Sequence, residues 1–266
     1  MANPTYQSGF YAPGRGTALH PELWRGCVGA WNPGLGNTGL SLRDWSGNQN
    51  NGTLTNGPTW GVSGGQQALS FDGTNDYVDV PHNASLNLVN AIALSVWVRP
   101  TGVFNEGILM KGPLTGSQGV FGLSVATAGA GWYFRLNGRV SEGYGQEAGG
   151  SPQINQWQHV AGTWDGTIMA LYVDNVLVGS SAYSTPIAAN SDSLKIGAYY
   201  DMSYTFPGLI DDVRIYNRGL SPQEVRTLAQ RPGIAYELAP RKFYSLPATA
   251  STRQYKLLRP SILRGA

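Results

Sequence analysis

Residues 159–182 read HVAGTWDGTIMALYVDNVLVGSSA. Three short apolar runs in this stretch are separated by Asp165-Gly166 and by Asp174-Asn175. Such Asp-Gly and Asp-Asn pairs tolerate the positive φ angles that two-residue hairpin turns require. The stretch therefore predicts three antiparallel strands that follow one another through tight turns.

Other parts of the chain show the same strand-and-turn pattern. Residues 91–100, AIALSVWVRP, alternate between apolar and other positions, and this predicts a strand with one buried face. That face carries Ile92, Leu94, Val96 and Val98. The chain also contains 36 glycines and 16 prolines in 266 residues, a content typical of many short strands joined by turns. We therefore expect an all-β sandwich or barrel.

One helix is predicted, at residues 221–230, SPQEVRTLAQ. Ser221 is a favourable N-cap, Pro222 suits the first helical position, and Glu224 completes a capping box. The sequence divides into three parts, and this helix ends the second of them. Residues 1–22 are expected to form an extended arm, residues 23–230 the strand-rich domain, and residues 231–266 a second arm.

The second arm is basic, whereas the rest of the chain is acidic. Residues 231–266 carry seven basic residues and one acidic residue, a formal charge of +6, and residues 1–230 carry −4. A basic tail on an acidic body favours docking to an acidic partner surface. The expected docking residues are Arg241, Lys242, Phe243, Tyr244, Arg253, Tyr255, Lys256 and Arg259. Nucleic acid is not favoured as the partner, because these charges are widely spaced.

The single cysteine and the absence of long apolar runs bear on location. Cys27 has no second cysteine with which to form an intrachain disulfide, and its apolar neighbours predict a buried side chain. The first residues lack the apolar region of a Sec signal peptide. The sequence contains no run of about 18 apolar residues and therefore predicts no membrane-spanning helix. These features predict assembly in a reducing cytoplasm, with a non-Sec route to the outside as the alternative.

Four landmarks resemble a known family. They are DWSGNQNNGTL (44–54), ALSFDGTNDYVDVP (68–81), WQHVAGTWDGTIMALYVDNVLVGS (157–180) and FPGLIDDVRIYNRGLSPQEVRTL (206–228). In this order they resemble the laminin-G-like jelly-roll domains of the concanavalin A-like lectin/glucanase superfamily. The resemblance implies two curved antiparallel sheets. It does not specify a function, since one fold can carry many functions.

The resemblance also bears on catalysis. Glucanases of this superfamily place their carboxyl groups in a Glu-x-Asp-x-x-Glu strand, because glycoside hydrolysis needs two facing carboxyl groups. That spacing is absent here: Glu142 and Glu147 have no aspartate between them and lie in a glycine-rich stretch. We therefore expect a protein that is not an enzyme.

The acidic stretch FDGTNDYVDVP (71–81) has two interpretations. Asp72, Asn75 and Asp76 offer the oxygen ligands that Ca²⁺ prefers. The resemblance implies a calcium ion on this loop, assisted by an acid of the IDDV strand, for which Asp211 is the first candidate and Asp212 the second. The alternative is a turn in which Asp72 caps backbone amides.

Aromatic residues gather in residues 199–206, YYDMSYTF. Exposed aromatic side chains mark binding sites, whereas buried ones belong to the core of a sandwich. We expect contact with a glycan or with another subunit at Tyr199, Tyr200 and Tyr204, extended by Trp132 and Tyr144.

Two functions are consistent with the sequence. The first is a structural protein on the surface of a phage-like virion, such as a decoration, cement or spike component. It would bind copies of itself and a capsid through its arms, and it could contact glycans. The second is a calcium-dependent, lectin-like adhesion module that binds carbohydrate. The arms and the missing signal peptide favour the first, and the fold and the aromatic stretch favour the second.

Overall fold

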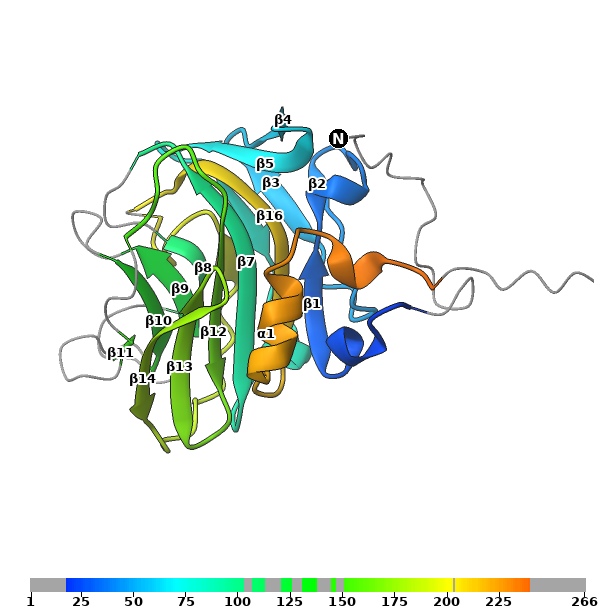
Figure 1. Ribbon diagram of the computed structural model, residues 1–266. Helices are drawn as coiled ribbons and strands as arrows, with labels where there is room; N and C mark the ends of the chain where they lie inside the picture. The colour runs from blue at the N-terminus through cyan, green and yellow to red at the C-terminus, as the bar shows by residue number, and fades with distance from the viewer. Residues whose placement is uncertain are drawn as a thin grey trace, which may run out of the picture.

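The computed structural model describes residues 18–102, 107–112, 121–125, 131–137, 145–146, 151–202 and 204–239. Within these ranges the chain forms two antiparallel sheets of eight strands each (Figure 1). The sheets pack face to face around one large apolar core. The expected all-β jelly-roll sandwich is therefore confirmed.

Sheet 1 has the strand order β14-β13-β12-β7-β16-β5-β4, and β1 pairs with β16 beside this path. Its strands are β1 (Cys27–Trp31), β4 (Thr59–Ser63), β5 (Gln66–Asp72), β7 (Ile92–Pro100), β12 (Gln158–Trp164), β13 (Ile168–Val173), β14 (Val176–Ala182) and β16 (Pro207–Tyr216). The three strands predicted in residues 159–182 are β12, β13 and β14. Their turns have positive φ at Gly166, Asp174 and Asn175, as the sequence predicts.

Sheet 2 has the strand order β11-β10-β9-β8-β15-β6-β3-β2. Its strands are β2 (Ser41–Leu42), β3 (Gly52–Thr55), β6 (Tyr77–Val80), β8 (Gly107–Lys111), β9 (Phe121–Val125), β10 (Trp132–Leu136), β11 (Gly145–Gln146) and β15 (Leu194–Ile196). Strands β8 to β11 are consecutive in the sequence, whereas β15 lies between β8 and β6, which are both far from it in the chain. The pair of β6 and β15 matters for the candidate site.

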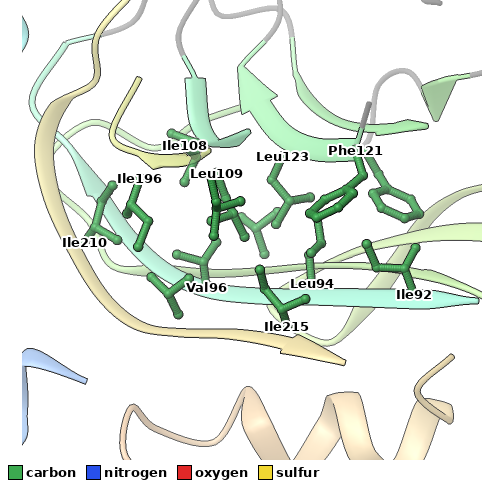
Figure 2. Close-up of a cluster of buried hydrophobic side chains, with 14 of the residues drawn as sticks. Ile92, Leu94, Val96, Ile108, Leu109, Phe121, Leu123, Ile196, Ile210 and Ile215 are labelled. Carbon is green, nitrogen blue, oxygen red and sulfur yellow. The ribbon is translucent and has the colours of Figure 1, made fainter. Parts of the chain in front are cut away.

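The core fills the space between the two sheets (Figure 2). Ile92, Leu94 and Val96 of β7 face Leu109 of β8 and Leu123 of β9, and all five are buried. The alternation predicted for residues 91–100 is therefore confirmed. The sheets approach closely beside Gly162, where a Cβ atom would lie 2.3 Å from the ring of Phe134.

The outer face of sheet 1 is covered by helices (Figure 1). These are α1 (Pro222–Leu228) and the 3-10 helices η1 (Pro21–Trp24) and η5 (Ile234–Tyr236). A further 3-10 helix, η2 (Pro33–Leu35), lies against β5 and β16, and η3 (Ala84–Leu86) buries Leu86 in the core between the sheets. Small side chains of sheet 1, such as Ala93 and Ala161, form a second apolar cluster with Val225, Leu228 and Ile234. Because alanine is small, α1 and η5 can lie close to the sheet. None of the helices in the described ranges is long and apolar enough to cross a membrane.

Helix α1 begins as the sequence predicts. The Ser221 hydroxyl accepts a hydrogen bond from the Glu224 amide, and the Glu224 carboxylate accepts one from the Ser221 amide. The helix ends at Leu228, two residues before the predicted end. Arg218 lies 2.6 Å from Glu224 and fixes the start of the helix to the preceding loop.

The two ends of the described chain lie beside one another. Ala18 forms a β-bridge with Leu238, and the Leu19 amide donates to the Glu237 carbonyl at 2.7 Å. Ile234, Ala235 and Tyr236 are buried, so the packed part of the chain continues past residue 230, where the sequence placed the start of the second arm.

Candidate functional site

The outer face of sheet 2 carries a polar surface built by strand alternation. On β6, Val78 and Val80 point into the core, so Tyr77 and Asp79 point outward. On the neighbouring strand β15, Lys195 lies directly opposite Asp79. Its Nζ donates to Asp79 Oδ1 at 2.6 Å and lies 4.9 Å from the centre of the Tyr77 ring.

The loop after β15 lies against sheet 2. A Cβ atom on Gly107 of β8 would lie 2.3 Å from the backbone of Ala198 and Tyr199, so this contact requires glycine. The loop is closed by the Tyr199 amide, which donates to the Tyr204 carbonyl at 3.0 Å, and by a bridge between Ala198 and Thr205. The loop therefore holds the residues after Tyr199 at a fixed place beside β15.

A pocket of about 620 Å³ lies between this loop and strands β6 and β15. The volume is within the range of pockets that bind small ligands. Its polar side chains are Asp79, His82, Ser191, Asp192, Ser193, Lys195, Tyr200 and Asp201. Pro81 and Met202 add apolar surface.

The chemistry of the pocket suits a ligand with several hydroxyl groups. Asp79, Asp192 and Asp201 supply carboxylate oxygens that accept hydrogen bonds, and Lys195 supplies a donor. The Tyr200 hydroxyl bonds to Asp192, and this negative charge raises the pKa of the tyrosine. Tyr200 is therefore held against one wall of the pocket by its polar end.

The aromatic predictions are partly wrong. Tyr204 is exposed and Tyr200 is half-buried and lines the pocket, so both can meet a ligand. Trp132 and Tyr199 are 0% and 1% exposed, and Trp132 belongs to the core, so neither forms a surface platform. They are buried because Trp132 points inward on β10, and Tyr199 packs against Met110 of β8. Tyr144 lies outside the described residues.

Tyr133 and Arg135 of β10 also lie on this outer face, although the sequence did not mark them as candidates. The Arg135 guanidinium lies 4.7 Å from the centre of the Tyr133 ring, and its Nε donates to Ser124 Oγ at 2.7 Å. Strand alternation could have found them, because Trp132, Phe134 and Leu136 occupy the inward positions of the same strand. Arg135 is nearly fully buried, and it also reaches the Tyr199 hydroxyl, so it supports the loop.

Residues 72–76 form a self-contained turn. Asp72 Oδ1 accepts hydrogen bonds from the amides of Thr74 and Asn75, and Asp76 Oδ2 accepts one from the Asp72 amide. The Thr74 amide in particular holds the pKa of Asp72 below its usual value. One oxygen of each carboxylate is thus bonded to the backbone of the turn, as the turn interpretation expects.

Asp211 is not part of this turn. Its carboxylate accepts a hydrogen bond from the Gln66 side chain at 3.0 Å, and Gln66 lies six residues before Asp72 on β5. Strand β16 pairs with β5 so that Pro207 lies opposite Asp72, and Asp211 lies four residues further along β16, about 13 Å of extended strand away. The predicted set of Asp72, Asn75, Asp76 and Asp211 is therefore not brought together, and this part of the prediction is wrong.

The surroundings of Asp211 nevertheless have two unusual features. Asp211 is 1% exposed, and burial and then the charge of Asp212 raise its pKa to about 7. Nearby, the buried Asn32 Oδ1 has no hydrogen-bond partner. A Cβ atom on Gly34 would lie 2.8 Å from Asn32 Oδ1 and 4.0 Å from Asp211 Oδ2, so both oxygens flank the same glycine. Across the part of the chain that the structure describes, no group of three or more His, Cys, Asp or Glu residues could hold a metal ion.

A serine and a histidine meet in sheet 1 at a distance typical of a nucleophile and its base. Ser95 Oγ and His159 Nε2 are 2.9 Å apart. Both are buried, and burial lowers the pKa of His159 to about 3. A substrate has no access to this pair, so both side chains have a structural role in sheet 1.

The predicted docking residues of the second arm, from Arg241 to Arg259, lie outside the described residues.

Comparisons with known proteins agree with this architecture. Residues 72–226 match the family described as the concanavalin A-like lectin/glucanases superfamily. A curated relative is the rat sushi, von Willebrand factor type A, EGF and pentraxin domain-containing protein 1, 25% identical over 174 residues. The match covers 60% of this chain but spans only 5% of that protein's length.

Several solved structures share the fold. Domain 4 of AbnA, a GH43 extracellular arabinanase from Geobacillus stearothermophilus, in complex with arabinotriose, has a TM-score of 0.64 and 20% identity. The likeness covers 77% of this chain and 98% of that one. The sialidase of Trypanosoma rangeli in complex with sialic acid has a TM-score of 0.57 and 18% identity, over 77% of this chain and 32% of that chain. The binding domain of botulinum neurotoxin DC in complex with SialylT has a TM-score of 0.56 and 15% identity, over 78% and 52%.

The raised pKa of Asp211 predicts a pH-dependent stability. Folding raises the pKa of this carboxyl group from a model value of 3.8 to about 7, so the folded state holds the proton more tightly than the unfolded chain. In EDTA, the contribution of the protonated Asp211 carboxyl group to the unfolding free energy should therefore be lost as the pH rises from ~4 to ~7. The loss should approach ~4 kcal/mol, at about 1.4 kcal/mol per pKa unit. Urea unfolding of the wild type and Asp211→Asn across this range measures it, and parallel pH profiles would contradict it.

Proposed function

The chain belongs to the concanavalin A-like lectin/glucanase superfamily, and we propose that it is a non-enzymatic module that binds a glycan in the pocket beside β6 and β15. The observation that carries the proposal is the pocket itself, which combines carboxylates, Lys195 and a half-buried tyrosine on a fixed loop. Sugars present many hydroxyl groups, and such carboxylates can accept hydrogen bonds from them. The arabinanase domain that shares this fold over 98% of its length is in complex with arabinotriose, which supports the proposal.

Binding without cleavage agrees with the state of the carboxyl groups. A glycosidase keeps one carboxylic acid protonated near neutral pH so that it can donate its proton to the leaving group. Among the described residues, the carboxyl group whose pKa is raised to about 7 is that of Asp211. This residue is buried in sheet 1, where no glycan reaches it.

Substitutions in the pocket test the proposal. Tyr200→Ala removes a wall of the pocket, and Asp79→Asn removes a carboxylate and the partner of Lys195. Each should weaken glycan binding by about tenfold or more, equivalent to ~1.4 kcal/mol. Binding can be measured on a glycan array and then by calorimetry.

Gln223→Ala is the matched control, because Gln223 lies on α1 over the outer face of sheet 1 and is exposed. It should bind like the wild type. A control that loses binding while the pocket variants keep it would place the site on the other sheet.

We also propose that a structural divalent cation binds between Asn32 and Asp211. The orphaned Asn32 Oδ1 supports this site because it would gain a partner from the cation. The buried Asp211 carboxylate accepts hydrogen bonds from Gln66 and from the Asp212 amide, and the cation would add a charge opposite to its own. The turn at residues 72–76 is the weaker candidate, because none of its described buried side-chain atoms lacks a hydrogen-bond partner. Water would complete the coordination.

The cation proposal predicts that 1 mM CaCl₂ raises the urea midpoint of the wild type. The free energy of unfolding should rise by ~2.7 kcal/mol when the calcium concentration is 100 times the dissociation constant. Asp211→Asn should abolish the gain, and Asp72→Asn should keep it. An identical midpoint with CaCl₂ and with EDTA would reject the site, and loss of the gain in Asp72→Asn alone would return it to the turn.

A role as a decoration or spike component of a phage-like particle is a second proposal. It is supported by the charge of the 231–266 segment and by the bridge between Ala18 and Leu238, from which both terminal segments leave the domain at one place. A single partner surface could then bind both. This location on a virion would allow the glycan site to contact a host.

Light scattering tests the particle proposal. The full chain should form oligomers, and a variant cut to residues 18–239 should be monomeric, because the expected contacts lie in the terminal segments. Two monomers would contradict self-association through these segments.

A further inference from the structure

The charges around the pocket point to the class of glycan that it takes. Three carboxylates, Asp79, Asp192 and Asp201, line it, against one lysine. Lys195 is already committed, because its Nζ donates to Asp79 at 2.6 Å and lies over the Tyr77 ring. The described walls thus carry an excess of negative charge at neutral pH.

The groups behind the pocket do not reverse this excess. Lys111 lies near Asp192, but it is 1% exposed and its Nζ donates to the Asn190 carbonyl at 3.1 Å. Its amine therefore does not reach a ligand. On the rim, His82 is exposed and is the remaining group of the described walls that can become cationic.

We propose that the pocket selects neutral glycans and rejects glycans that carry a carboxylate, such as sialylated or glucuronylated ones. This inference rests on the proposed glycan-binding function of the same pocket. Hydroxyl groups of a neutral sugar donate to the aspartates, whereas a sugar carboxylate only accepts hydrogen bonds and meets no uncommitted lysine on the described walls. Juxtaposed like charges weaken an interface and exclude the wrong partner.

The proposal departs from what the shared fold would suggest. Structures with the same fold have been solved with sialic acid and with SialylT. At identities of 15–18% the likeness extends to the fold, and the charges of the pocket are this chain's own. A neutral ligand is consistent with arabinotriose, which accompanies the fold in the arabinanase domain.

An array that pairs each neutral glycan with its sialylated and glucuronylated counterpart tests the proposal with the full chain at pH 7.5. Neutral members should bind at least tenfold more tightly than their charged counterparts in 50 mM NaCl. This gap, the ratio of the affinity for a neutral glycan to that for its charged counterpart, should narrow in 500 mM NaCl, because salt screens charges at a solvent-exposed site.

A charge variant ties the selectivity to this pocket. Asp192→Asn combined with Asp201→Asn should narrow the gap between neutral and charged members. Glu22→Gln changes the same kind of charge on η1 and should leave the gap as in the wild type. A variant gap equal to that of the wild type would overturn the assignment of the selectivity to these aspartates.

The outcomes separate the two proposals. Charged members that bind as tightly as neutral ones, or more tightly, overturn the selectivity and leave glycan binding standing. Binding to no member of the array overturns the proposed function, and the selectivity with it.

Discussion

Strand β16 is the constraint on which the structure depends. It pairs with β7, β5 and β1, and nine of its ten residues are buried. A bulge between Asp211 and Arg214, with Asp212 at φ 41°, adds a residue to the strand. Ile210 and Val213 therefore both face the core, although three positions separate them. Without the bulge, strict alternation would turn one of them outward.

The bulge also places an ion pair beneath the helices. Arg214 Nε donates to Asp212 Oδ1 at 2.9 Å, and both side chains are fully buried. The guanidinium lies 4.9 Å from the ring centre of Trp24 and 4.5 Å from that of Tyr236. One cation thus joins η1 and η5 to sheet 1. Removal of one partner from a buried pair leaves an uncompensated charge, which costs about 3–5 kcal/mol.

The two outer faces of the sandwich therefore differ in what they carry. The outer face of sheet 1 holds α1, η1 and η5, and their apolar and charged contacts close the domain. The outer face of sheet 2 carries Asp79, Lys195 and the loop of residues 198–206 around a pocket. The helices stabilise one face, and the pocket on the other face is free to bind.

The sequence predicts the elements well because their signals are local. The turn at Asp174-Asn175, the face of β7 and the capping box of Ser221 and Glu224 each depend on residues close in the chain. The pocket depends instead on strand register. Lys195 meets Asp79 across 116 positions, and no local pattern reveals that pairing.

Register also explains the predictions that are wrong. Asp211 was grouped with the turn at residue 72 because the family resemblance implies an acid of the IDDV strand at that loop, but the pairing of β16 with β5 places it near Gln66 instead. Trp132 was assigned to the surface from its aromatic character. Its position in β10 decides the opposite, because every second residue of that strand enters the core.

The proposed glycan site is tested most directly by a map of backbone amide shifts in the NMR spectrum of the full chain, titrated with the neutral glycan that binds best. We expect changes at Asp79, Lys195 and Tyr200 on the outer face of sheet 2, and none at Tyr172 or Gln223 on the outer face of sheet 1. Changes confined to Tyr172 and Gln223 would show that the glycan site lies on the helix-covered side and not in the pocket beside β6 and β15.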